Sequence, residues 1–276
     1  VDPSRKGEIR AINDGSLYAQ VDVIFPILHG PYGEDGTMQG LFELSGIPYV
    51  GPGVLASSVG MDKEFTKKVL AAAGLPVAPE VIPKGRTELS EEEKQHLGLP
   101  VFVKPARGGS SIGVSKVNSW EEFPAAVDLA LEDDEKILVE PEIVGQEVEI
   151  GVLHYADGTL LASVPALLAG IDDSDEGFYG FDTKYLDNVV TAEIPAPFTP
   201  ELTEKLRDMA VRAFEALNCE GLSRVDFFVT EDSVYINEIN TLPGFTPISM
   251  YPQVLAASGV EYPALLEALI EQALAK

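Results

Sequence analysis

Acidic and amide side chains interrupt an otherwise apolar strand pattern near the end of the chain. Asp226 lies in the run RVDFFV, and Glu238 and Asn240 lie in VYINEIN. A buried carboxylate without a partner is costly or stays protonated, so we expect a cation beside these residues. Oxygen donors with no His or Cys nearby favour Mg²⁺, which proteins hold through one or two carboxylates and substrate phosphates. The alternative is a structural ion pair between Arg224 and Asp226 or Glu238.

The two runs predict a β-hairpin, and the hairpin sets a geometric condition on the metal site. Side chains alternate between the faces of a strand, so Glu238 and Asn240 share one face. Asp226 joins that face only if the residue numbers of two paired residues, one from each strand, add up to an even number. A pairing of Phe227 with Asn237 would meet this condition. The connecting loop must then hold an odd number of residues, or the hairpin must carry a bulge.

The composition indicates a soluble globular protein with two or three domains. The chain has 276 residues, of which 45% are hydrophobic, and this is enough for a large core. No apolar run approaches the ~20 residues of a membrane helix, and no leader opens the chain, so we expect a cytoplasmic protein and no membrane partner. The single cysteine, Cys219, excludes an internal disulfide framework and Cys-cluster metal sites.

The charge balance excludes some partners and narrows the search for others. Lys and Arg number 19 against 45 Asp and Glu, and the formal net charge is −26. A surface this acidic repels nucleic acid and anionic lipid. An anionic substrate therefore needs a few basic residues gathered at one place. Lys63, at the start of a predicted helix, and Lys104, on a predicted strand, are candidates.

The predicted elements of the first third indicate half of an open α/β domain. Residues 21–30 read as a buried parallel strand, 37–45 as a short helix and 47–50 as another strand, which together form a βαβ unit. GPGVLA at 51–56 matches a dinucleotide fingerprint, but no acidic residue follows about 20 positions later. We interpret it as a tight strand-to-helix turn.

The middle of the chain contains a glycine-rich hairpin. Two strand-like runs, PVFVKP and IGVSKV, enclose ARGGSS, whose backbone N–H groups could close over phosphates. The preceding helix, within residues 61–76, is expected to bury Phe65, Val69 and Ala72. No Walker-type phosphate motif occurs in the sequence.

A lid and scaffold helices are predicted in the second half. Residues 136–150 read as a strand, a kink and a second strand. Residues 170–189 lack core periodicity yet contain four aromatic side chains, which favours a lid that carries Lys184 and Tyr185 toward a ligand. Residues 200–217 and 262–276 read as amphipathic helices.

In combination these motifs resemble the ATP-grasp superfamily and, within it, the D-alanine:D-alanine ligases. The matching segments are LHGPYGEDGTMQG, MDKEFTKK, VFVKPARGGSSIGVSKV, FDTKYLD, GLSRVDFF and NEINTLPGFTPISMYP. The resemblance implies an α/β class that is α+β in the ATP-binding part. It also implies three parts: a truncated N-terminal α/β domain (1–59), a central ATP-grasp subdomain (60–142) and a C-terminal ATP-grasp subdomain (143–276).

The resemblance implies an ATP site with two metal ions. Lys63, Lys104 and the lid residue Lys184 are expected at the nucleotide, with Glu140 at the adenine and Glu147 at the ribose. The loop residues closing on the phosphates are Gly108, Gly109, Ser110 and Ser111. The ligands of two Mg²⁺ ions, or of Mn²⁺, are Asp226, Glu238 and Asn240.

The implied reaction builds the dipeptide of the peptidoglycan precursor. The γ-phosphoryl group of ATP passes to the carboxylate of one D-alanine, and the amine of a second attacks the acyl phosphate. Arg224 and the Gly244 N–H are expected to hold the oxyanion. Ser249 and Met250 are expected to receive the second D-alanine's carboxylate. The residues implied at the amino-acid subsites are His29, Ser110 and Tyr185.

Two alternatives stay open, and one departure from the family matters. A D-alanine:D-lactate ligase would share the fold, although this lid has Lys184-Tyr185 and no histidine. An inactive ATP-grasp module would only bind nucleotide. The family begins with a strand and a glycine-rich loop whose glutamate meets the first D-alanine's amine, and none precedes Val1. If that segment is absent from the molecule, we expect weak or no ligation with ATP binding retained. The family also implies a homodimer.

Overall fold

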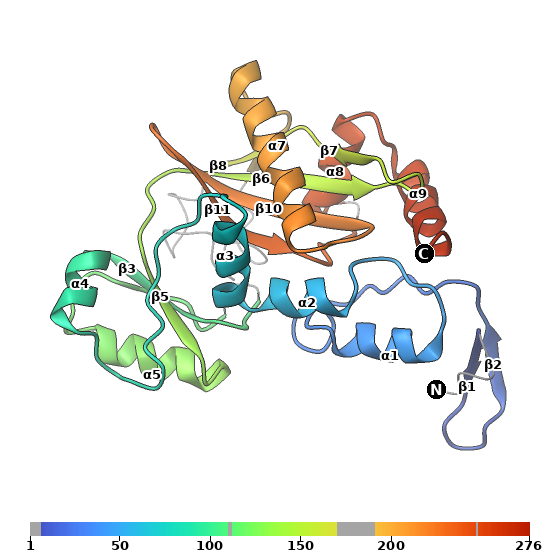
Figure 1. Cartoon of the computed structure of the whole chain (residues 1–276), viewed down its shortest axis with the longest axis horizontal. Coiled ribbons are helices and arrows are strands. Elements are labelled where there is room, and N and C mark those ends of the chain that lie inside the picture. Colours follow the sequence, from blue (N-terminus) through green and yellow to red (C-terminus); the bar gives the residue numbers. More distant parts are fainter. Residues whose placement is uncertain (1–6, 110–111, 170–190, 247) are drawn as a thin grey trace.

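The computed structural model describes residues 7–109, 112–169, 191–246 and 248–276, and its centre is a large antiparallel sheet (Figure 1). The strand order is β11-β10-β6-β8-β9, with β7 paired to β6. These strands are β6 (Gln146–His154), β7 (Leu160–Ala162), β8 (Ala166–Ala169), β9 (Thr191–Glu193), β10 (Leu222–Val229) and β11 (Val234–Asn240).

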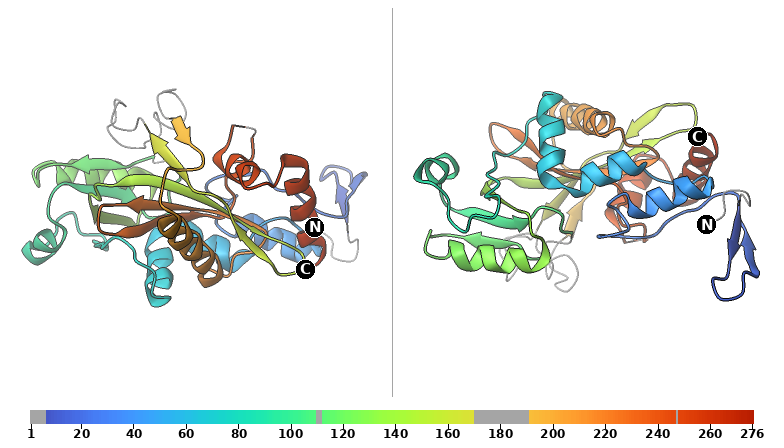
Figure 2. Two further views of the ribbon diagram at one scale, coloured as in Figure 1. Left: turned by 90° about the horizontal axis from the view of Figure 1, so that it is seen from above. Right: turned by 60° about the horizontal axis from the view of Figure 1, so that its bottom comes forward.

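Helices cover both faces of this sheet. On one side α3 (Lys63–Ala72) and α7 (Pro200–Ala216) pack on β6, β10 and β11 in an apolar core that includes Leu70, Phe214 and Phe227. On the other side α8 (Met250–Ala257) and α9 (Tyr262–Leu274) enclose a second core around Tyr251. Figure 2 (left) shows α7 and α8 on opposite sides of the sheet. The predicted helices over 200–217 and 262–276 are confirmed.

A smaller sheet forms a separate layer with its own core. Its order is β4-β3-β5, from β3 (Val101–Pro105), β4 (Ser115–Val117) and β5 (Ile137–Pro141). Helices α4 (Glu91–Leu97) and α5 (Phe123–Asp133) pack with it around Val103, Val127 and Val139. The antiparallel pairing of β3 with β4 confirms the glycine-rich hairpin. We call this layer, residues 86–142, the central module.

The N-terminal part only partly follows the prediction. The hairpin β1 (Glu8–Arg10) and β2 (Leu17–Gln20) precedes α1 (Thr37–Ser45), which matches the expected helix. The strands expected over 21–30 and 47–50 are wrong as full strands, because these two segments are joined by a single parallel bridge, between Ile24 and Tyr49. Pro26 and Pro48 lack the N–H groups that a longer ladder would need. Helix α2 (Val54–Met61) follows a turn at Gly51, whose φ of 109° favours glycine.

The buried face of α3 also differs from the prediction. Phe65 is 51% exposed, whereas Lys67 on the same helix is 4% exposed. The Phe65 ring lies instead beneath the ammonium of Lys136, 4.6 Å from its centroid. Helix α3 therefore turns a lysine toward the interior, and the reason is an ion-pair cluster that the sequence does not reveal. Leu70 and Leu75 pack in the core of the large sheet, although they fall within the expected central subdomain (60–142). The expected domain boundary between residues 59 and 60 therefore stays a proposal.

Within the described ranges, no helix is both long and apolar enough to cross a membrane.

Candidate active site

The β10–β11 hairpin satisfies the condition set by the sequence. Asp226 pairs directly with Glu238, so the two carboxylates share a face. The connection, residues 230–233, holds four residues, and the register shifts by one between Asp226 and Phe227. The predicted bulge is therefore present. The example pairing of Phe227 with Asn237 is wrong, because Phe227 lies opposite Ile236 and Asn237 is the extra residue.

A third carboxylate extends the row onto β6. Glu149 is the β6 partner of Asp226, so Glu149, Asp226 and Glu238 lie side by side across three strands. Arg224 lies among them, with Nε and Nη2 each 2.7 Å from an oxygen of Asp226 and Nε 3.1 Å from Glu149 Oε2. Burial disfavours the guanidinium charge, but Asp226 and Glu149 outweigh it and raise the pKa of Arg224 well above its usual value. The ion pair considered as the alternative is therefore present.

The residues at this face fit a magnesium ion. Asp226 and Glu238 are opposed, and Asn240 Nδ2 donates to Asp226 Oδ2 at 2.9 Å, which leaves the amide oxygen of Asn240 for a cation. The described residues contain no group of three or more His, Cys, Asp or Glu placed to hold a metal ion. Two carboxylates and one amide oxygen thus need further oxygen ligands, and substrate phosphates commonly supply them to Mg²⁺.

Two lysines, Lys67 and the predicted phosphate residue Lys104, share one buried glutamate. Glu140, on β5, is 5% exposed, and its two oxygens contact the ammonium groups of Lys67 and Lys104. Burial and the positive charges of Lys67 and Lys63 lower the pKa of Lys104 to about 7. Burial likewise lowers the pKa of Lys67 to about 8, although Glu80, at 3.7 Å, opposes that change. The protonated form of Lys104 is therefore disfavoured by its surroundings, and a bound anionic ligand would stabilise it.

Lys67 is a residue that sequence reasoning missed. Its ammonium donates to the carbonyl of Ala78 at 3.2 Å as well as contacting Glu140. Lys67 thereby joins α3, the linker before α4 and β5. On the sequence it stands four residues after Lys63 in a polar helical segment, where a solvated lysine is the ordinary interpretation.

The glycine-rich loop lies against other parts of the predicted site. The Lys63 ammonium donates to the Gly108 carbonyl at 2.8 Å. A Cβ added to Gly109 would lie 3.9 Å from the Cα of Gly30, so the loop approaches the segment that follows His29. Glu147 and Glu238 both favour the charged form of Lys104, although they come from the large sheet. The structure thus brings the predicted phosphate and metal residues into one region.

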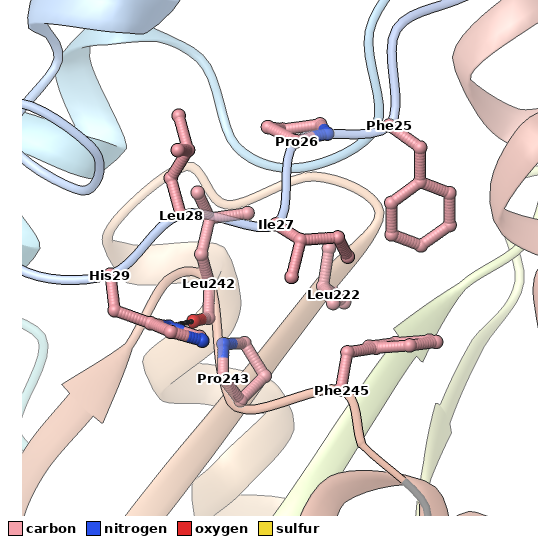
Figure 3. Close-up of a pocket in the computed structure, with 9 residues that line it drawn as sticks. All are labelled: Phe25, Pro26, Ile27, Leu28, His29, Leu222, Leu242, Pro243 and Phe245. Atoms are coloured by element: carbon pink, nitrogen blue, oxygen red, sulfur yellow. Dashed lines mark hydrogen bonds between the residues drawn. The ribbon is translucent and has the colours of Figure 1, made fainter.

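His29 lines a small apolar pocket together with Phe25, Leu242 and Phe245 (Figure 3). Its Nδ1 is 3.1 Å from the carbonyl oxygen of Leu242, in the loop that follows β11. Glu34, which sequence reasoning did not single out, accepts from the Gly30 N–H at 2.5 Å. Burial raises the pKa of Glu34, and the negative charge of Glu238 adds to the rise. Glu34 stands in the motif HGPYGEDG together with the predicted residue His29, and this proximity in sequence is the signal that could have identified it.

The loop after β11 gathers the residues predicted at the second substrate. A Cβ on Gly244 would lie 2.8 Å from Ser249 Oγ, so these two residues are in contact. Ser249 is the N-cap of α8 and its hydroxyl accepts from the Thr246 N–H at 3.0 Å, while Met250 begins the helix. A helix N-terminus and a close glycine backbone form a surface suited to a carboxylate or an oxyanion.

Four predicted site residues lie outside the described residues, namely Ser110, Ser111, Lys184 and Tyr185. The same holds for the whole predicted lid, residues 170–189. Their expected roles stay predictions.

Comparison with known proteins identifies the family. A model described as the C-terminal part of D-Ala-D-Ala ligases matches residues 69–271, and one described as the N-terminal part matches residues 2–52. A D-alanine–D-alanine ligase of Corynebacterium efficiens is 65% identical over 274 residues, which are 99% of this chain and 76% of that protein. One from Nocardia farcinica is 57% identical, covering all of this chain and 76% of the relative.

Solved structures agree in fold. A D-alanine-D-alanine ligase from Coxiella burnetii superposes with a TM-score of 0.83 at 36% identity, over 97% of this chain and 73% of its own. A Bacillus anthracis ligase complexed with ATP gives 0.78 at 30% identity, over 92% and 79%. VanG, a D-Ala:D-Ser ligase from Enterococcus faecalis, gives 0.79 at 35%, over 92% and 74%. The expected ATP-grasp fold is confirmed, and the chain belongs to the D-alanine:D-alanine ligase family.

Proposed function

We propose that this protein joins two D-alanine molecules with ATP and Mg²⁺, giving D-alanyl-D-alanine, ADP and phosphate. One observation carries the proposal. Asp226 and Glu238 face each other beside Arg224, and Lys104 lies close enough for the negative charge of Glu238 to raise its pKa. Metal ligands, an arginine and a phosphate lysine are thereby grouped, as acyl phosphate chemistry requires.

The nucleotide end of the site is assigned to the two lysines and the central module. Lys63 and Lys104 bind the phosphates, and Gly108 and Gly109 approach them through the backbone. Lys104 then leaves Glu140 for a phosphate oxygen, which favours its charged form because the phosphate is the stronger anion. Glu140 keeps its contact with Lys67 and can accept from the adenine amine, while Glu147 accepts from the ribose.

The reacting end is assigned to the large sheet and the loop after β11. Asp226, Glu238 and Asn240 would hold Mg²⁺, which would supply positive charge to offset the negative charge of the nucleotide phosphates. The carboxylate of the first D-alanine takes the γ-phosphoryl group and ADP leaves. The second amine attacks the carbonyl carbon, and phosphate leaves with the original carboxylate oxygen. Arg224 and the Gly244 N–H stabilise the oxyanion formed in that attack.

The test measures product and phosphate together. Purified protein is given ATP and Mg²⁺ with D-alanine, with D-alanine plus D-lactate, or with no amino acid. We expect phosphate release only when D-alanine is present, and a product mass of the dipeptide. A matched Glu238→Gln variant should lose at least 100-fold in rate, because one of two carboxylate ligands loses its charge. Depsipeptide as the main product would favour the D-lactate alternative, and nucleotide binding without release would favour the inactive module.

Further family features belong to the same proposal. The resemblance supports a homodimer, a cytoplasmic location and a division into three parts near residues 59 and 142. Sedimentation of the purified protein tests the first of these, with a mass near 59 kDa, about twice the 29.6 kDa of the chain, as the expected result.

A further inference from the structure

We propose that Glu149 is a positioning residue that keeps Arg224 at the reacting carbonyl while Asp226 binds the metal ion. The inference rests on the proposed function, because it assigns Arg224 to the oxyanion and Asp226 to Mg²⁺. Those two assignments conflict in the ligand-free arrangement. Both oxygens of Asp226 are engaged by Arg224, at 2.7 Å each, so a metal ion at Asp226 competes with the arginine for the same carboxylate.

Glu149 has the placement to resolve this competition. It lies opposite Asp226 on the neighbouring strand, so Arg224 has a carboxylate on each side. Glu149 Oε2 is 3.1 Å from the Arg224 Nε, and the Glu149 side chain is only 5% exposed. A carboxylate at this depth is costly unless it interacts with a cation, and Arg224 is a cation within reach.

Glu149 acts through Arg224 and not as a metal ligand. Although Glu149, Asp226 and Glu238 stand in one row, the described residues include no trio of acidic side chains close enough to share an ion. Three carboxylates and one guanidinium leave a formal charge of −2 on this face, which matches one divalent cation. Once that cation holds Asp226 and repels Arg224, Glu149 is the carboxylate that stays with the arginine.

Removal of the Glu149 charge should therefore affect two measurable properties. In Glu149→Gln, Arg224 loses one of its two carboxylate contacts, relies more on Asp226 and competes more strongly with the metal ion. We expect kcat to fall about 10- to 100-fold, in the range seen when supporting partners of site residues are removed. We also expect Mn²⁺ to bind the enzyme–ADP complex about 10-fold more weakly. The KM for ATP should change less than about threefold, because the described contact of Glu149 is with Arg224, which is assigned to the oxyanion and not to the nucleotide.

The Mn²⁺ measurement separates positioning from a structural role. Free Mn²⁺ is counted by electron paramagnetic resonance in the presence of ADP, without turnover. A merely structural ion pair would lower the melting temperature of Glu149→Gln but leave Mn²⁺ affinity and kcat within about twofold. That result would overturn the proposal. Glu149→Asp keeps the charge with a shorter reach and should recover part of both properties, and it serves as the second variant if Glu149→Gln does not fold.

A control variant accounts for the loss of one negative charge. Glu220 pairs with Lys276 at 2.7 Å and is 40% exposed, away from the carboxylate row. Glu220→Gln should leave kcat and Mn²⁺ affinity unchanged. Equal effects in Glu220→Gln and Glu149→Gln would contradict the inference. If the wild type forms no dipeptide, the proposed function fails, whereas the Mn²⁺ comparison still decides the role of Glu149.

Discussion

At the scale of single residues, burial lowers the pKa of two lysines near the proposed phosphate site. Lys104 has a pKa of about 7 and Lys67 one of about 8, because both are buried close to other lysines. A nucleotide phosphate favours the protonated form of Lys104 and raises its pKa again. Protons are taken up on binding wherever the pH lies between the free and bound pKa values, which here means above about 7.

Proton uptake on ADP binding is the first prediction. At pH 8 we expect uptake of roughly half a proton or more per ADP, and clearly less at pH 6, where Lys104 is already charged. Calorimetry in two buffers of different ionisation enthalpy measures the difference. In Lys104→Met the pH 8 uptake should shrink even where binding is still measurable. Uptake that is the same at pH 6 and pH 8 would contradict a lowered pKa of Lys104.

The second prediction concerns Lys67. In Lys67→Met, Glu140 keeps only Lys104 as a cationic partner and holds it away from the phosphates. We expect the KM for ATP to rise about 10-fold, with a smaller change in kcat, because the loss falls mainly on binding. Lys68→Met is the matched control, since Lys68 is the next residue of α3 and its side chain is 57% exposed. A KM for ATP that rises equally in both variants would show that Lys67 has no special role.

Residues of the site differ in how far the sequence could predict them. Asp226 and Glu238 were predictable because they interrupt apolar strands. Glu149 was not, because EVEIGV alternates charged and apolar residues as a strand with one solvated face does. Its burial depends on β10 and on Arg224, which lie 75 positions further along the chain. Lys67 was missed for the same reason, since its partner Glu140 belongs to another layer.

At the scale of elements, the bulge in β11 left a signal in the sequence. Val234 and Ile236 are buried two residues apart, but the next buried residue, Ile239, follows after three. A strand with a strict period of two cannot bury all three on one face, so the extra residue had to fall between Ile236 and Ile239. This spacing locates the bulge more closely than the condition that the loop holds an odd or even number of residues. Residues 21–30 show the opposite case, in which the sequence signal was misleading. Their strand propensity gives only a single bridge, at Ile24, because no extended neighbouring strand pairs with them.

Close packing of α8 on β6 leads to the third prediction. A Cβ on Gly151 would lie 2.5 Å from the Leu255 side chain and 3.0 Å from the Tyr251 ring, so Gly151→Ala must shift these side chains of α8. We expect a loss of about 1 to 3 kcal/mol of stability. Because α8 starts at Met250, the KM for the second D-alanine should rise more than the KM for ATP. Denaturant unfolding and steady-state kinetics measure the two effects.

Gly40→Ala is the control for that variant. Gly40 lies inside α1, and a Cβ there would meet nothing within 4 Å. Alanine should therefore stabilise the helix by about 0.5 to 1 kcal/mol and leave both KM values unchanged. A Gly151→Ala protein as stable and as active as Gly40→Ala would show that α8 can shift without consequence.

At the scale of the whole molecule, ion pairs connect the central module to α3. Lys136 of the central module contacts both Asp62 and Glu64 at the start of α3, and Lys67 contacts Glu140. The module's apolar core is a separate cluster. Sequence patterns predict which strand or helix each charged residue belongs to. They do not predict these pairs, because the partners lie more than 70 positions apart in most cases.

The excess of acidic residues leads to the fourth prediction, on salt. A net charge of −26 repels itself in the folded state, and dissolved salt screens exposed charges beyond about 10 Å at 0.1 M. Salt also weakens exposed ion pairs, but those contribute only about 0 to 1 kcal/mol each, and buried pairs such as Lys67–Glu140 are screened much less. Repulsion should dominate, so we expect the melting temperature to rise by about 3 °C or more between roughly 0.05 and 0.5 M NaCl.

A charge-reversal variant tests the cause of this salt effect. Glu267 and Glu271 are exposed on α9, and changing both to lysine would reduce the net charge from −26 to −22. The comparison uses the slope of melting temperature against salt, because lysines near a helix C-terminus also stabilise the protein at any salt concentration. Since fewer charges remain to be screened, the slope should be smaller in the variant. An unchanged slope would mean that salt acts through ion binding or general exclusion. A melting temperature that falls with salt would mean that exposed ion pairs outweigh the charge repulsion.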